Sequence, residues 1–288
     1  MYIVRVGEPS FKAHRMSTTN LVVVSDLHCG CRVGLCPPGP IRLDGGGTYS
    51  PSKFQKKVWR WWLDFWQEWV PQATHGEPFD LVINGDVLDG VHHRSTTQIS
   101  QDIEDQVEIA RAAVKLPISL CERLYWIRGT EAHVGPSGVH EERIAKDFAA
   151  VPDDEGRHAR FELWKQVGEA LVHVTHHIGT TGRAAYESSA PQAELIAMLA
   201  EAGRWRDAPP HFVVRSHRHR FIKVTNPGER RLESIVTPGW QGKTPFVHKI
   251  PGGRVSQPQF GGILIRQGDA EFFSRERLYK LSRSKVEA

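Results

Sequence analysis

Five short apolar runs along the chain each end directly in a polar turn, and this pattern constrains the fold more than any other feature. The runs are Leu21–Val24, Phe79–Ile83, Leu124–Ile127, Leu171–Val174 and Phe212–Val214. Continuous runs of this length, rich in β-branched residues, are typical of strands that are buried on both faces. We therefore predict five buried strands, each with polar residues at its carboxyl end.

Helical segments lie between these runs, at Ser50–Val70, Ser95–Leu116 and Glu187–Gly203. The first two repeat apolar residues at steps of three or four, and the third has a proline near its start and a glycine at its expected end. Strands that alternate with helices predict a layered α/β fold.

The first helical segment is rich in tryptophan, which invites a base-stacking or partner-binding interpretation. Its apolar stripe consists of Phe54, Val58, Trp62, Phe65 and Trp69. A stripe at helical spacing is usually core, so we interpret it as buried against the protein. The three tryptophans off the stripe are expected to be the more exposed ones: Trp59, Trp61 and Trp66.

Composition is that of an ordinary globular chain, with 288 residues of which 40% are hydrophobic and 24% charged. No apolar run approaches 18 residues, so no membrane span is expected. The first residues lack the apolar stretch of a secretory signal, which favours a cytoplasmic protein. We expect one domain over residues 1–288, with the motif-bearing core at about 20–240 and a poorly ordered tail at 274–288. The oligomeric state stays open.

Three of the four cysteines lie within eight positions, which raises the question of a zinc site. They are Cys29, Cys31 and Cys36. Their C-x-C-x4-C spacing lacks the paired C-x2-C pattern of common zinc sites, so we interpret them as reduced thiols. They begin a stretch rich in glycine and proline, residues 29–49, which either rims the functional site or forms a passive surface loop.

The polar residues after the apolar runs are carboxylates and imidazoles, the ligand set of a hydrolytic divalent metal site. Ligands in open α/β sheets bind at the carboxyl ends of strands, so these residues can converge. Asp26 and His28 stand two apart, and extended backbone would put both on one face. Asp86 follows a glycine, and its two oxygens can bridge two cations. His217 and His219 are also two apart, but each can face a different ion.

Each motif alone is a weak signal, because Asp-x-His and His-x-His are common by chance, whereas their joint order is specific. The order is Asp26-x-His28, Gly85-Asp86-x-x-Asp89, Gly129-Thr-Glu-Ala-His133, His176-His177 and Ser216-His217-x-His219. It resembles the calcineurin-like metallophosphoesterase superfamily, whose pattern is D-x-H, G-D-x-x-D, G-N-H-[DE], H and G-H-x-H. The segment Thr237–Trp240 resembles the one that often follows in that family.

The resemblance implies an α/β fold, a four-layered α-β-β-α sandwich with mixed sheets and the site at one end. It also implies two divalent metal ions. Metal one would take Asp26, His28, Asp86 and His219, and metal two would take Asp86, His176, His217 and a residue of the third motif. His177 would be a neighbour of the ligands, and Asp89 would support them by hydrogen bonding.

The third motif departs from the family pattern, because Thr130-Glu-Ala-His133 stands where Asn-His is usual. The family's Asn ligates metal two and its His assists the leaving group. Here Glu131 is expected to supply the oxygen ligand and His133 to act as the acid. Thr130 is the alternative at the Asn position.

A phosphate-ester hydrolase follows from the resemblance, with Mn²⁺ as the first expectation for the metal and Fe, Zn, Ni, Co or Mg as alternatives. We expect His92, His93 and Arg183 to contact the substrate, the arginine as a bidentate phosphate clamp. Neither the choice between phosphodiesterase and phosphomonoesterase nor that between nucleotide and nucleic-acid substrates follows from the sequence.

Two other functions compete with this one. The chain is alternatively a metal-dependent nuclease within a nucleic-acid-processing assembly, or a metal-binding scaffold that has lost catalysis. The net charge of +4 suits a phosphate-bearing substrate, but it falls short of the clustered Lys and Arg of a nucleic-acid footprint.

Overall fold

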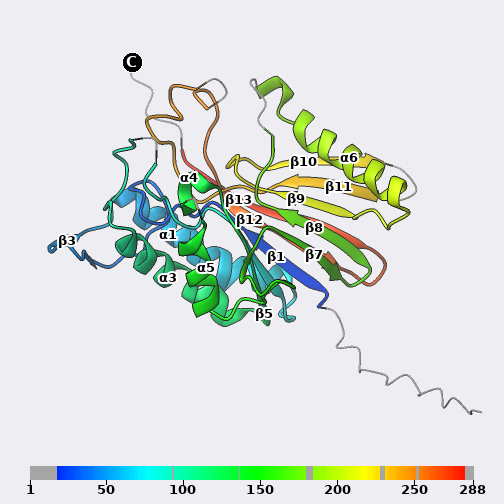
Figure 1. Cartoon of the computed structure of the whole chain (residues 1–288), viewed down its shortest axis with the longest axis horizontal. Coiled ribbons are helices and arrows are strands. Elements are labelled where there is room, and N and C mark those ends of the chain that lie inside the picture. The colour runs from blue at the N-terminus through cyan, green and yellow to red at the C-terminus, as the bar shows by residue number, and fades with distance from the viewer. Residues whose placement is uncertain are drawn as a thin grey trace, which may run out of the picture.

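The computed structural model describes residues 18–92, 94–135, 137–179, 184–227, 231–250 and 253–282. Two large mixed sheets face each other (Figure 1). The first sheet has the strand order β13-β12-β1-β4-β5-β6 and the second β10-β11-β9-β8-β7. Their strands are β1 (Asn20–Val24), β4 (Asp80–Asn84), β5 (Arg123–Ile127), β6 (Ala159–Arg160), β7 (Glu162–Val167), β8 (Ala170–Thr175), β9 (Phe212–Arg215), β10 (Ile222–Pro227), β11 (Arg231–Val236), β12 (Gln259–Gln267) and β13 (Phe272–Lys280).

Helices cover the outer face of each sheet. The remaining elements are α1 (Lys53–Asp64), η1 (Phe65–Trp69), α2 (Val70–Ala73), α3 (Ile103–Leu120), α4 (Glu131–Val134), α5 (Val139–Asp147), η2 (Ala184–Tyr186) and α6 (Ser189–Trp205), with a small hairpin β2 (Ile41–Arg42) and β3 (Thr48–Tyr49). Helices α1, α3 and α5 pack on the first sheet, and α6 packs on the second. None of the described helices is both long and apolar enough to cross a membrane.

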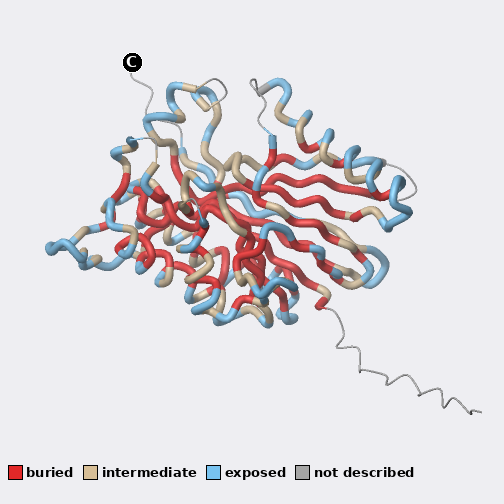
Figure 2. The backbone as a smooth tube through the Cα atoms, in the orientation of Figure 1, coloured by how far each residue is buried: buried red, intermediate tan, exposed pale blue. Residues whose placement is uncertain are grey.

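The alternation of side chains along the strands explains the layers. In β1, Leu21 and Val23 join the core between the two sheets, whereas Val22 and Val24 join the core under the helices. All five residues of β1 are buried, as Figure 2 shows in red for the strands at the centre of the molecule. The predicted four-layered α-β-β-α sandwich with mixed sheets is therefore confirmed, and so are the five predicted strands.

The tryptophan-rich helix is core, as predicted. Ser52 caps α1 with a capping box to Gln55, and Trp62 Nε1 donates to the Ala113 carbonyl on α3 at 3.1 Å. Trp59 and Trp61 are half-buried as expected, but Trp66 is fully buried. The reason is the π-helical turn η1, whose wider spacing rotates Trp66 toward the core.

Several helix boundaries differ from the prediction, and two of them have a clear local cause. Helix α3 begins eight residues late, because Asp102 caps it through Glu104 N, and Ile99 lies before it with its N–H bonded to the Gly30 carbonyl. Helix α6 continues through Gly203 and ends when Arg206 adopts a left-handed conformation. Local capping decided both boundaries, and apolar periodicity alone does not reveal it.

The predicted poorly ordered tail is wrong for residues 274–280, which belong to β13. This strand pairs with β12 along nine residues and so gains its order from the ladder. Its sequence lacks an apolar signal because most of its side chains are exposed or half-buried. Residues 283–288 lie outside the described residues, and the single domain over 1–288 stays a prediction.

Candidate metal centre

The expected ligands come together where strands of both sheets end. Strands β1 and β4 are parallel neighbours in the first sheet, and β8 and β9 are parallel neighbours in the second. Asp26 and Asp86 lie two residues beyond β1 and β4, His176 directly follows β8, and His217 lies two residues beyond β9. Because the two sheets face each other, their carboxyl ends open onto one place.

A first group of candidate ligands consists of Asp26, His28 and His219. Asp26 Oδ1 lies 3.2 Å from His219 Nε2, and the Nε2 atoms of His28 and His219 are 3.0 Å apart. Two nitrogens that bind one divalent ion at about 2.1 Å stand roughly 3.0–3.4 Å from each other. The spacing of the three side chains therefore fits one cation.

A second group consists of Asp86, His176 and His217. Asp86 Oδ2 lies 3.0 Å from His176 Nε2 and 3.7 Å from His217 Nδ1. Asp86 also belongs to a group with His28 and His133, so it stands between the two clusters. This is the position that a bridging carboxylate requires.

The backbone of these ligands is unusual. Five candidate ligands have positive φ angles between 46° and 69°: Asp26, His28, Asp86, His217 and His219. The expectation that extended backbone aligns Asp26 and His28 is thus wrong. Hydrogen bonds hold this strained loop, since Asp26 N donates to Gly85 O and His28 N to Asp86 O, and the intervening Leu27 is fully buried. Left-handed backbone at non-glycine residues is costly and clusters at functional sites.

Buried atoms without hydrogen bonds supply a test of whether a cation fits. Asp26 Oδ1, His176 Nε2 and His217 Nδ1 are buried and make no hydrogen bond of regular geometry, and each faces only an atom of another candidate ligand, 3.0–3.7 Å away. Buried polar atoms normally find partners, and these three point into the clusters of carboxylates and imidazoles. Together with the donor set, they fit a pair of divalent cations.

Hydrogen bonds behind the ligands fix their orientation. His176 Nδ1 donates to the Asn84 carbonyl at 2.6 Å, which leaves Nε2 to face Asp86. His28 Nδ1 lies 3.3 Å from Asp89 Oδ1. The Asp89 carboxylate in turn accepts hydrogen bonds from Gln98 at 3.0 Å and Gln241 at 3.1 Å. Asp89 thus stands behind a candidate ligand, as metal sites require of an outer partner.

The electrostatics of the groups favour a bound cation. Burial alone would lower the pKa of His176, but the Asp86 carboxylate outweighs it and raises that pKa to about 10. Burial likewise opposes ionisation of Asp26, yet His219 holds the pKa of that carboxyl at about 2. Positive charge is therefore stabilised at the positions of these imidazoles, next to the carboxylates.

The candidate ligands differ in their exposure to solvent. The side chains of Asp26 and Asp86 are at most 1% exposed, whereas those of His217 and His219 are 29% and 25% exposed. The two histidines after β9 are therefore the candidate ligands most accessible from solvent, whereas the carboxylates lie beneath them.

Comparison with known proteins gives distant likenesses. No family model and no curated protein matches the chain. Vacuolar Protein Sorting 29 from Cryptosporidium parvum is 12% identical, with a TM-score of 0.35 over 92% of this chain and 100% of that chain. A metallophosphoesterase from Sphaerobacter thermophilus is 10% identical, with a TM-score of 0.38 over 92% and 89%. A predicted phosphoesterase from Streptococcus pneumoniae TIGR4 is 9% identical, with a TM-score of 0.34 over 91% and 99%.

These likenesses concern the fold alone and assign no activity. The motif order, the four layers and the paired clusters stand independently of them. In these three respects the chain resembles the calcineurin-like metallophosphoesterases.

The third motif contributes Thr130 to the centre and leaves Glu131 outside. Thr130 N and Oγ1 donate to Asp86 Oδ1 at 2.7 and 3.1 Å, so this residue holds the central carboxylate. Glu131 is exposed on α4 and belongs to none of the candidate metal groups found among the described residues. The structure therefore does not bring the expected oxygen ligand to the cluster, because Thr130 caps α4 and Glu131 begins the helix facing outward.

His133 reaches the centre from the next helical turn. Its Nε2 lies 4.0 Å from Asp86 Oδ2, and its Nδ1 donates to the Asp89 carbonyl at 2.6 Å. Burial, with help from the neighbouring His28, lowers the pKa of His133 to about 4. At neutral pH the side chain is therefore uncharged and presents the Nε2 lone pair to the site.

Of the remaining predicted residues, two lie beside the candidate metal centre and two lie outside the described residues. His92 forms a group with Asp89 and His133, and its ring centroid is 4.6 Å from that of His133. His177 is exposed and stacks at 4.8 Å on His217, which makes it a neighbour of a candidate ligand. His93 and Arg183 lie outside the described residues.

Three supporting residues escaped the sequence prediction. Gln98 and Gln241 hold Asp89, and the buried Glu141 accepts hydrogen bonds from Val87 N and Gly129 N, both at 2.8 Å. Gln241 directly follows the Thr237–Trp240 segment, so its place in the sequence was a usable signal. Glu141 lies on α5, far along the chain, and no local pattern reveals its role.

Proposed function

We propose that this chain is a metal-dependent phosphoesterase that binds two divalent cations. Asp26, His28 and His219 would hold one cation, and His176 and His217 the other, with Asp86 shared between them. The observation that supports this most is the placement of Asp86 between two clusters, each with imidazole nitrogens about 3–4 Å from a carboxylate oxygen or from another imidazole nitrogen.

When bound, two such cations lower the pKa of a water so that it can attack phosphorus, and they neutralise charge on the phosphoryl oxygens. The chain's own residues supply the geometry. Asp26 and Asp86 are fixed by backbone hydrogen bonds within the strained turns, so their oxygens need no rearrangement. The partly exposed His217 and His219 form the mouth through which the ester enters.

His133 is proposed to assist the leaving group. The Asp89 carbonyl fixes its ring through Nδ1, so Nε2 stays directed at the centre. The free side chain is neutral near pH 7 because its pKa is about 4. An arriving phosphoryl anion favours the imidazolium and raises this pKa, which allows Nε2 to carry a proton to the departing oxygen.

The test combines metal analysis with hydrolysis of bis(4-nitrophenyl) phosphate. Wild type should bind two equivalents of Mn²⁺ and turn over the ester. Asp86→Asn should lose metal and activity, while the exposed His75→Asn serves as a control that keeps both. Full metal occupancy without turnover for any divalent ion would favour the scaffold function, and an Asp86→Asn variant of wild-type activity would refute the proposed centre.

A further inference from the structure

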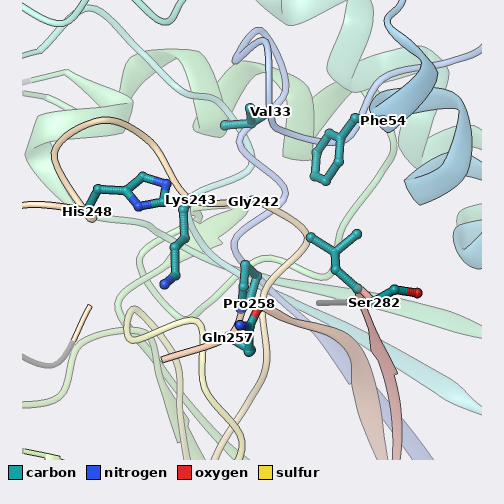
Figure 3. A pocket seen from close by; sticks show the side chains of 9 residues that line it. Val33, Phe54, Gly242, Lys243, His248, Gln257, Pro258 and Ser282 are labelled. Carbon is teal, nitrogen blue, oxygen red and sulfur yellow. The ribbon is translucent and has the colours of Figure 1, made fainter. Parts of the chain in front are cut away.

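A pocket of about 340 Å³ opens between three distant parts of the chain (Figure 3). One half of its lining is apolar, from Val33, Phe54, Pro258 and Leu281. The other half is polar and includes Lys243 and His248. Ligand pockets in proteins have volumes of roughly 300–1,000 Å³, so this space suits a group the size of a nucleotide.

The wall of the pocket that contains Lys243 is connected by hydrogen bonds to the candidate metal centre. Lys243 lies two residues after Gln241, whose Nε2 donates to Asp89. Two residues of extended chain span at most about 7 Å, so the Cα atoms of Lys243 and Gln241 are no further apart. Trp240 N donates to the carbonyl of Asp26 at 2.9 Å, which fixes the start of this wall.

The opposite wall, which contains Val33, is connected to the same centre through the loop after β1. Cys31 N donates to the carbonyl of His28 at 3.0 Å, and Gly242 N donates to the carbonyl of Val33 at 2.7 Å. The two walls are thus joined to each other and to two candidate ligands. A Cβ on Gly242 would come within 2.7 Å of the Phe54 ring, so only glycine lets this ring lie against the wall.

The charge of the pocket favours an anion. None of the residues described as lining it is Asp or Glu. Residues 234–268 contain no acidic residue, yet they include Lys243 and Arg254. Lys243 Nζ donates to the Arg254 carbonyl at 3.2 Å, which positions the ammonium and leaves its other protons for a ligand.

We propose that this pocket binds a nucleotide unit of the substrate, with the base on the Phe54 side and a phosphate at Lys243 and His248. An aromatic face for stacking beside a cation is the combination that recognises a nucleotide without reading its sequence. The inference rests on the proposed function for the identity of the scissile bond, and it assigns the substrate class of that site. The metal centre would then cleave the phosphate next to the bound nucleotide.

A kinetic experiment compares two esters with the same leaving group, thymidine 3′-phosphate 5′-(4-nitrophenyl phosphate) and bis(4-nitrophenyl) phosphate. Lys243→Ala should raise KM for the nucleotide ester by about tenfold with kcat little changed. It should leave bis(4-nitrophenyl) phosphate hydrolysis unaltered, and Lys243→Arg should restore most of the loss. Lys249→Ala removes an exposed lysine from the same loop and should change neither substrate. Equal losses on both esters, or none, would contradict the pocket's role.

A binding experiment keeps the inference testable even if wild type hydrolyses neither ester, an outcome that would count against the proposed function. Calorimetry with AMP and with inorganic phosphate should show tighter binding of AMP, and Lys243→Ala should weaken the binding of AMP. A short single-stranded oligonucleotide separates the two sources of the nucleotide unit. If Lys243→Ala weakens the oligonucleotide as well, the unit belongs to a strand, and otherwise to a free nucleotide. Equal affinities of wild type for AMP and phosphate would overturn the proposal.

Discussion

The Nε2 atoms of His28 and His219 lie 3.0 Å apart, although 191 positions separate these residues in the chain. One follows β1 of the first sheet and the other follows β9 of the second. Each ring has an independent anchor, because His28 Nδ1 faces Asp89 and His219 Nε2 also faces Asp26. The packing of two sheets therefore creates this pair, and under the proposed function one cation would bind both imidazoles.

Removing one of these histidines should abolish metal binding at one cluster and preserve it at the other. His219→Ala is expected to reduce bound Mn²⁺ from two equivalents to one, because only the first cluster loses a ligand. Activity should fall by more than the roughly 10–100-fold seen when outer hydrogen-bond partners of metal ligands are lost. Elemental analysis and ester hydrolysis measure the two effects, and retention of both equivalents would remove His219 from the centre.

Gln241 should matter for metal affinity although it binds no metal. Gln241→Ala removes a hydrogen bond to Asp89, which faces His28, so affinity for Mn²⁺ should fall about 10–100-fold. A Mn²⁺ titration followed by electron paramagnetic resonance measures it. The exposed Gln192→Ala is the matched control, and equal affinities for the two variants would contradict the prediction.

Metal binding should release protons and tighten as pH rises. The Asp86 carboxylate raises the pKa of His176 from 6.5 to about 10, so this imidazole is protonated near pH 7 and must lose its proton to bind a cation. Affinity should therefore increase between pH 6.5 and 10. The metal-free protein should lose stability over the same window, because a raised folded-state pKa stabilises only while the proton is bound. Calorimetry in two buffers of different ionisation enthalpy counts the protons, and a count of zero would refute this assignment.

Glu141 should stabilise the loops that carry Asp86 and Thr130. Its two oxygens accept from Val87 N and Gly129 N, although burial raises the pKa of this carboxyl to about 7. Glu141→Gln would point an amide NH₂ at one of these N–H donors and leave it unsatisfied, at a cost of about 1–3 kcal/mol. Chemical denaturation should show that loss, and the exposed Glu169→Gln should show none.

Gly129 should be essential for the position of Asp86. A Cβ there would lie 2.3 Å from both Asp86 N and Asp86 Oδ1, closer than any real contact. Gly129→Ala should therefore displace the shared carboxylate and abolish binding of both metal equivalents. Gly203→Ala is the control, because its Cβ would meet nothing within 4 Å and alanine favours its helix. Unchanged metal content in Gly129→Ala would argue against Asp86 as the shared ligand.

The sequence by itself determined five of the strands, three of the helices and the chemistry at the strand ends. The runs at Leu21–Val24 and Phe212–Val214 are apolar throughout, as is typical of strands buried on both faces, and Asp26 and His217 follow within three residues. Burial patterns and ligand types are local properties of a chain, so a single sequence reveals them.

Tertiary structure alone decided which residues reach the candidate metal centre and which face solvent. Thr130 faces Asp86 and Glu131 faces solvent because a cap begins α4 between them, and the sequence allowed either order. Strand β13 gained its order from pairing with β12, and Gln241 reached Asp89 across 152 positions. Contacts between distant segments depend on how the two sheets pack, and no local pattern in the chain encodes that packing.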